Sequence, residues 1–152
     1  MVKWIVATVG MMFAAGCATK IETVAVASVV APSAVAAAFM RAVADSNFSQ
    51  MGDLWGTSGG SALASGKPVN WLQRVAVMHA YLKGGAAKVV GESPGSAKGE
   101  RRVLLIELAR DGCVKTVPFT MIRTKQGSWL VNAVDLNAAG VPGRSCERAK
   151  GT

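Results

Sequence analysis

The sequence predicts an α+β fold in which N-terminal helices pack on a curved antiparallel β-meander. Apolar residues in the first half of the chain recur at three- and four-residue spacing, which is typical of amphipathic helices. From Lys88 onward they alternate or run together in segments bounded by Gly and Asp, as in strands joined by tight turns. Asp111-Gly112 is a two-residue turn sequence that connects neighbouring antiparallel strands. Helices that precede the strands, rather than alternate with them, favour a helical layer on one face of a sheet.

Two helices are expected first. Pro32 and Ser33 are residue types that open helices, and the helical stripe after them breaks near Asp45-Ser46-Asn47. A second short stripe runs from Phe48 to Trp55. The Gly/Ser-rich stretch 56–68 is predicted to be a loop, and long loops in compact domains are more often functional or mobile than structural.

A third helix is predicted after this loop. Asn70, with Gln73 three residues later, predicts a capping box at its start. Gly84-Gly85 predicts its end, where a left-handed backbone fits. Its apolar face comprises Trp71, Val75, Met78 and Leu82.

Four strands are expected, at residues 88–92, 101–109, 113–124 and 128–136. Pairing Arg110 with Cys113 turns Leu104, Ile106, Leu108, Val117, Phe119 and Met121 toward the helices. Pairing Lys125 with Ser128 adds Leu130, Asn132 and Val134 to that face and leaves Glu107, Ile122 and Trp129 on a mixed opposite face. Pro118 lacks a donor, so it indicates a bulge or an edge, and a bulge there would shift this register.

The first 17 residues have the layout of a secretory signal. Lys3 precedes an apolar run from Trp4 to Phe13, which is too short for a permanent membrane span. The run ends in Ala14-Ala15-Gly16-Cys17, which resembles the lipobox of bacterial lipoproteins, in which the Cys is lipidated and becomes the mature N-terminus. The alternative is ordinary signal cleavage with Cys17 as a bystander. Ala18 after the Cys implies, by resemblance to Gram-negative sorting, an outer-membrane anchor facing the periplasm.

The chain is then divided into a lipoprotein signal peptide (1–16), a tether (17–31), one α+β domain (32–140) and a C-terminal tail (141–152). The chain has 17 Lys and Arg against 9 Asp and Glu, a formal net charge of +8. Such a charge can attract anionic surfaces. Nucleic acid is not expected as a partner, because the basic residues are scattered and the predicted compartment is the cell envelope.

Three cysteines are present: Cys17, Cys113 and Cys146. If Cys17 carries the lipid, the other two remain in an oxidising compartment, and a Cys113–Cys146 disulfide that pins the tail is the simplest pairing. A metal or redox pair has less support, because the chain has no CxxC and a single histidine, His79. We expect no metal and no cofactor.

The order of elements resembles the nuclear-transport-factor-two-like fold, the cone-shaped superfamily that includes ketosteroid isomerase. The residues that carry the resemblance are the opening Pro32-x-x-Val35-x-x-x-Phe39-x-x-Ala42, the continuation Asp45…Phe48-x-x-Met51-x-x-Leu54 and the final-strand sequence Gly127-Ser-Trp129-Leu-Val131. The resemblance covers about residues 32–136 and implies a pocket inside a cone between sheet and helices. It also implies a sheet that often dimerises. The long Gly/Ser loop departs from the family, which often has a strand pair there.

No catalytic residue of the isomerases can be placed on a matching position of this chain. No phosphate-binding loop, GxSxG elbow or HExxH motif occurs. Candidate pocket residues are His79, Met78, Met121 and Asn132, and candidate interface residues are Trp129, Ile122 and Glu107. The sequence therefore favours a non-catalytic, lipid-anchored envelope domain that binds a small apolar ligand or a protein partner. The mixed face of the sheet is alternatively the seam of a homodimer. The alternative is a small isomerase- or hydratase-type enzyme that uses His79 and a nearby acid.

Overall fold

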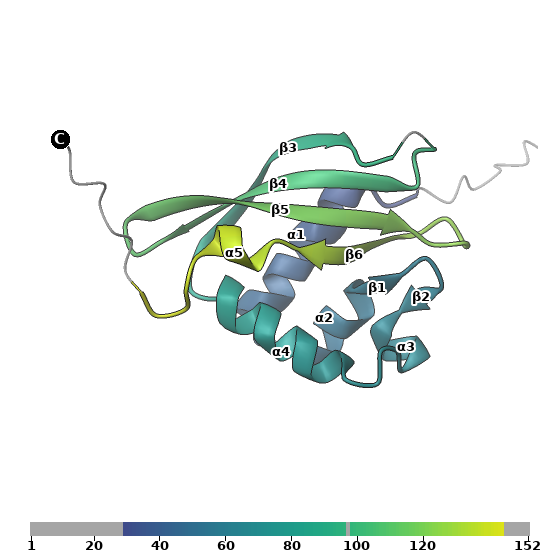
Figure 1. Ribbon diagram of the computed structural model, residues 1–152, viewed down its shortest axis with the longest axis horizontal. Helices are drawn as coiled ribbons and strands as arrows, with labels where there is room; N and C mark the ends of the chain where they lie inside the picture. The colour runs from purple at the N-terminus through teal and green to yellow at the C-terminus, as the bar shows by residue number, and fades with distance from the viewer. Residues whose placement is uncertain (1–28, 97, 145–152) are drawn as a thin grey trace, which may run out of the picture.

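The computed structural model describes residues 29–96 and 98–144. It is an α+β structure in which helices cover one face of a four-stranded antiparallel sheet that does not close into a barrel (Figure 1). The helices and the short N-terminal hairpin form one layer and the sheet forms the other. The predicted signal, the lipidation residue Cys17 and the tail cysteine Cys146 lie outside the described residues, so these predictions are not tested by the fold.

The first two helices begin and end close to their predicted positions. Helix α1 spans Pro32–Ala44, with the proline in its first turn, although no side chain caps it. Helix α2 spans Phe48–Leu54 and is capped by Asn47, whose Oδ1 accepts the Gln50 N–H at 3.0 Å. The polar break between the stripes therefore acts as a cap as well as a turn.

The stretch predicted as a loop is largely ordered, which corrects the sequence analysis. Strands β1 (Gly56–Thr57) and β2 (Gly60–Ser61) form a short antiparallel hairpin. Helix α3 (Ala62–Ser65) follows, capped by the Ser61 hydroxyl, which accepts the Ala64 N–H at 3.2 Å. These elements could not be predicted from the Gly/Ser-rich sequence, because each is only two to four residues long and shows no periodic apolar pattern.

Helix α4 spans Trp71–Leu82, as predicted, but the expected capping box is absent. The Asn70 side chain makes no cap; its Oδ1 instead accepts a hydrogen bond from Arg74 Nε at 3.1 Å. The helix ends at Leu82 and its C-cap residue Lys83 is extended, so the predicted left-handed cap is not formed there. Gly84, one residue later, has φ +84°.

Four strands form the sheet in the order β3-β4-β5-β6, so the predicted meander is confirmed. Their bounds are Ala86–Pro94, Arg101–Arg110, Cys113–Arg123 and Trp129–Val134. Arg110 pairs with Cys113 as predicted, across a turn in which Asp111 and Gly112 both have positive φ. A short helix α5 (Leu136–Ala139), absent from the sequence analysis, follows β6.

The predicted register of β6 is wrong over its first half. Met121 pairs with Val131 and Arg123 with Trp129, whereas Thr120 pairs with Ala133, so Asn132 is the extra residue of a bulge. The bulge turns Trp129 and Val131, rather than Leu130 and Asn132, toward the helices. The predicted place of Trp129 on the outer face is therefore incorrect.

Pro118 marks an edge and not a bulge. It pairs with Leu105 in an unbroken β4–β5 register. On its other side β6 has already ended at Val134, and the Pro118 carbonyl accepts the Asp135 N–H at 3.0 Å. The missing proline donor therefore costs the sheet no ladder hydrogen bond.

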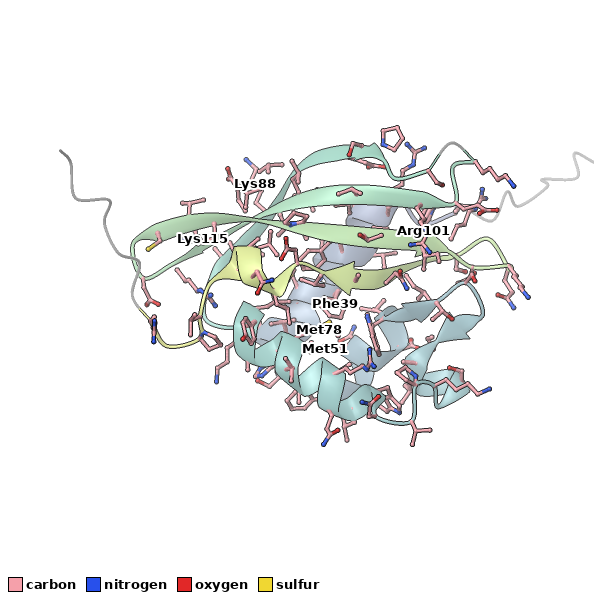
Figure 2. The ribbon with its side chains drawn as sticks, viewed as in Figure 1. Phe39, Met51, Met78, Lys88, Arg101 and Lys115 are labelled. Carbon is pink, nitrogen blue, oxygen red and sulfur yellow. The ribbon has the colours of Figure 1, made fainter. Side chains whose placement is uncertain are left out.

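The core lies between the helices and the sheet, and it confirms the predicted apolar face of β4 and β5. Figure 2 shows Phe39, Met51 and Met78 in this layer. Phe39 meets Phe119 of β5 edge to face, with ring centroids 6.1 Å apart. The largest fully buried side chains include Phe39, Phe119, Met51, Leu82, Leu104, Ile106, Leu108 and Met121.

Candidate functional site

A groove between α4 and the β6–α5 segment is a candidate ligand site. Its volume is about 570 Å³, within the usual range for small-molecule sites. We call it the α4–β6 groove. It is lined by Trp55, Asn70, Gln73, Arg74, Val77, Met78, Asn132, Ala133, Val134 and Leu136.

The apolar wall of this groove comes from three chain segments. Met78 reaches it from the buried face of α4, while Val77 is half exposed at the rim. Val134 and Leu136 contribute from the opposite side, where β6 passes into α5. A ligand that enters would cover the apolar surface of Val77, which solvent now contacts.

Asn132 fixes one polar end of the groove. As the bulged residue it leaves the β-ladder, and its Nδ2 donates to the Gly56 carbonyl at 2.9 Å. Its own backbone carbonyl accepts the Trp55 Nε1–H at 3.0 Å. These two bonds tie Trp55 and the start of β1 to β6 at the bulge.

Arg74 gives the groove a positive rim. Its guanidinium is exposed and is steadied by the Nε bond to Asn70. The groove lining contains no carboxylate. The arrangement therefore suits a ligand with an apolar body and an anionic or hydrogen-bond-accepting group.

His79 lies apart from this groove. Its Nε2 is 3.0 Å from Ser46 Oγ, and its ring meets the edge of Phe48 with centroids 5.0 Å apart. Burial, and secondly the nearby Lys83 charge, lower the pKa of His79 below 6.5. It is a half-buried histidine satisfied by a hydroxyl.

The surface beside His79 is a second hollow of about 410 Å³, lined also by Lys83, Arg110, Asp111 and Arg144. Arg110 is engaged structurally. It donates from Nη1 to the carbonyls of Tyr81 (2.6 Å) and Lys83 (3.2 Å) and from Nη2 to that of Ala139 (2.6 Å). This hollow is therefore mainly a junction where helices end.

Of the four predicted pocket residues, the structure brings together Met78 and Asn132. Met121 is fully buried in the core and His79 lies in the other hollow. Sequence reasoning missed Trp55 and Arg74 as groove residues. The helical spacing from Phe48 places Trp55 in the second stripe, whereas in the structure it is the extended residue that ends α2, directly before the Gly-rich sequence.

The predicted interface residues also separate. Trp129 is buried in the core cluster. Ile122 and Glu107 lie on the outer face of the sheet, where Glu107 pairs across strands with Lys88 and Thr116. Whether this face binds a partner stays a prediction.

Over residues 29–96 and 98–144, no helix has both the length and the apolar character required to cross a bilayer. In that same part of the chain, no three His, Cys, Asp or Glu side chains gather as a metal site requires. Comparison of the chain with models of protein families, with curated proteins and with solved structures finds no match.

Proposed function

We propose that this protein is a lipid-anchored cell-envelope domain whose non-catalytic role is to bind a small amphipathic ligand in the α4–β6 groove. The observation that carries this proposal is the groove itself, which combines an apolar wall with the Asn132 amide and the Arg74 guanidinium. We also propose that the domain is a divergent member of the nuclear-transport-factor-two-like superfamily. The order of helices and meander, together with the strand pair β1–β2, supports this assignment.

The same arrangement bears on the alternative functions. His79 is directed away from the groove, and no carboxylate is buried among the described residues. The isomerase or hydratase alternative therefore gains no support from this site. A protein partner or a second copy on the outer sheet face is a separate proposal, with half-exposed Leu105 and exposed Val114 as its apolar contacts.

Ligand binding is tested with dodecanoate and dodecanol as paired probes, measured by calorimetry on the purified full chain. Both should bind, because both have an apolar tail. Arg74→Gln should weaken dodecanoate binding about tenfold, the loss of one charge-assisted contact, and leave dodecanol unchanged. Failure of either probe to bind would overturn the proposal.

A matched pair of variants assigns the binding to the groove. Val77→Glu places a charge on its half-exposed apolar rim and should abolish binding of both probes. Val69→Glu makes the same change at a position that is 96% exposed and outside the groove, and it should leave binding unchanged. Equal losses in the two variants would place the site elsewhere.

The anchor is tested by intact mass of protein extracted from the membranes of a Gram-negative host. The expected product lacks residues 1–16 and carries acyl chains, and Cys17→Ser should abolish both changes. An unacylated, soluble product would overturn the anchor proposal and indicate a free periplasmic or secreted domain instead.

A further inference from the structure

Two loops at one end of the sheet bring four basic side chains together. Lys98 lies in the β3–β4 connection and Arg101 begins β4. Arg123 ends β5 and Lys125 lies in the β5–β6 turn, and all four are exposed. We call this cluster the basic end. Figure 2 shows Arg101 at this end of the sheet, well separated from Lys88 and Lys115.

Backbone hydrogen bonds hold the loops of the basic end in place. The Arg123 N–H donates to the Glu100 carbonyl at 2.8 Å, and the Lys125 N–H donates to the Ser58 carbonyl at 3.0 Å. The Arg123 Nε also donates to the Gly127 carbonyl at 3.3 Å. These bonds hold the backbone at Glu100, Arg123 and Lys125 in place, and Glu100 supplies one opposing charge beside the cluster.

The first described residues lie at this same end. Val29 and Val30 line a hollow together with Gln126, Gly127 and Ser128 of the β5–β6 turn. They are 58% and 59% exposed. The preceding chain, which runs back to Cys17, thus joins the domain beside the basic end.

The length of that connection limits how far the domain can lie from an acylated Cys17. Twelve residue steps separate Cys17 from Val29, so the fully extended span is about 40 Å. Within that reach a charged surface samples the region near the headgroups, where the field extends roughly 8–10 Å at physiological salt. Each Lys or Arg at an anionic bilayer strengthens the attraction about fivefold.

We infer that the basic end is a membrane-facing surface that docks on anionic phospholipid headgroups and orients the tethered domain. The inference rests on the proposed lipid anchor. The α4–β6 groove shares no lining residue with the basic end.

The test compares the acylated full chain in nanodiscs of phosphatidylcholine alone and of phosphatidylcholine mixed with phosphatidylglycerol. Amide hydrogen exchange of residues 98–101 and 123–128 should be slower on the anionic discs, and high salt should remove the difference. Exchange in the Asp111-Gly112 turn should not change. Equal exchange on both discs would overturn the inference.

Two charge-matched variants make the test specific. The triple variant Arg101→Gln, Arg123→Gln, Lys125→Gln should lose the protection, while Lys83→Gln, Lys88→Gln, Lys115→Gln removes the same charge elsewhere and should retain it. Loss of protection in both variants would mean that net charge alone causes the slower exchange, and this result would overturn the inference. Thermal unfolding of each variant confirms that it is folded.

The measurement also separates this inference from the proposals on which it depends. If the mass shows no acylation, vesicle sedimentation replaces the nanodiscs. The protein should then bind phosphatidylglycerol vesicles about a hundredfold more tightly than the basic-end triple variant does, and equal binding would overturn the inference. The basic-end triple variant should bind dodecanoate as the wild type does. Failure of ligand binding in the α4–β6 groove can therefore be told apart from failure of membrane docking.

Discussion

Arg110 joins two helix ends to the β4–β5 hairpin through one guanidinium. The carbonyls of Tyr81 and Lys83 at the end of α4, and of Ala139 at the end of α5, all accept from it. Carbonyls at helix ends lack partners within the helix, and a positive charge there is favourable. One side chain thereby satisfies acceptors on two helices.

Replacing Arg110 should therefore destabilise the domain strongly. We expect Arg110→Ala to lower the free energy of unfolding by about 2–3 kcal/mol, measured by urea denaturation. Arg110→Lys should recover little of this, because an ammonium lacks the planar fork that reaches several carbonyls. Arg102→Ala is the control, since Arg102 has an exposed ion pair with Glu92 at 3.8 Å, and its loss should be under about 1 kcal/mol. Similar effects of the Arg110 and Arg102 changes would contradict the bridging role.

His79 should make stability depend on pH in a predictable direction. Its folded-state pKa is lowered by burial and then by Lys83, so the unfolded chain binds the proton more readily. The contribution is complete above the unfolded pKa, near 6.5, and is lost as the pH falls below it. Thermal unfolding of wild type and His79→Gln should therefore diverge between neutral and mildly acidic pH, with the wild type losing more. Parallel curves would show that His79 titrates as freely in the folded state as in the unfolded chain.

At the scale of elements, the β4–β5 hairpin was predictable and β6 was not. The Asp111-Gly112 turn sets the first register locally, since both residues adopt the positive φ that this turn requires. The bulge at Asn132 depends on the side chain of that residue reaching Gly56, 76 residues earlier, and on the Trp55 indole. The alternation of apolar and polar residues along β6 depends only on neighbouring residues, so it does not predict contacts with residues that lie far away in the sequence. The α4–β6 groove could therefore not be predicted either, because the bulge is what places Asn132 in its lining.

Helices α2 and α4 meet where Gly52 contacts the Trp71 ring. A Cβ at position 52 would overlap that ring, with Cε3 only 2.9 Å away. The spacing of apolar residues does not indicate this contact, because a glycine adds no side chain to the pattern and is a weak helix former. The close approach explains a glycine in the middle of a seven-residue helix.

Gly52→Ala should accordingly destabilise the domain by about 1–2 kcal/mol, despite the higher helix propensity of alanine. The overlap should be relieved when Trp71→Leu is added. The double-variant cycle, measured by urea denaturation, should then show a favourable coupling of about 1 kcal/mol. Additive effects of the two changes would mean that the helices adjust without strain.

At the scale of the whole molecule, β5 runs between the two ends of the domain at which the described chain starts and stops. Its 11 residues span roughly 36 Å. Val29 lies beside the turn that follows β5, and Arg144 shares a hollow with Asp111 of the turn that precedes it. The first and last described residues, Val29 and Arg144, therefore lie at opposite ends of the domain.

Edge strand β3 shows how the sheet limits unwanted pairing. It is largely exposed, yet it carries Lys88, a register shift between Val89 and Gly91, and a terminal Pro94. A charge, an irregularity and a proline each oppose strand addition at an open edge. A partner on this sheet is thus more compatible with its outer face than with β3.

The end that carries Arg144 is where the predicted Cys113–Cys146 disulfide would form. Asp111, two residues before Cys113, lines the same hollow as Arg144, two residues before Cys146 in the sequence. We expect Cys146→Ser to lower the free energy of unfolding by about 3–4 kcal/mol under oxidising conditions, because the bridge closes a long loop in the unfolded chain. A reductant should lower the free energy of unfolding of the wild type to that of Cys146→Ser. The difference between these two proteins under oxidising conditions should persist when Cys17→Ser is added to both. If reductant and Cys146→Ser both leave urea denaturation unchanged, the tail is not covalently pinned, and the two cysteines do not constrain the unfolded chain.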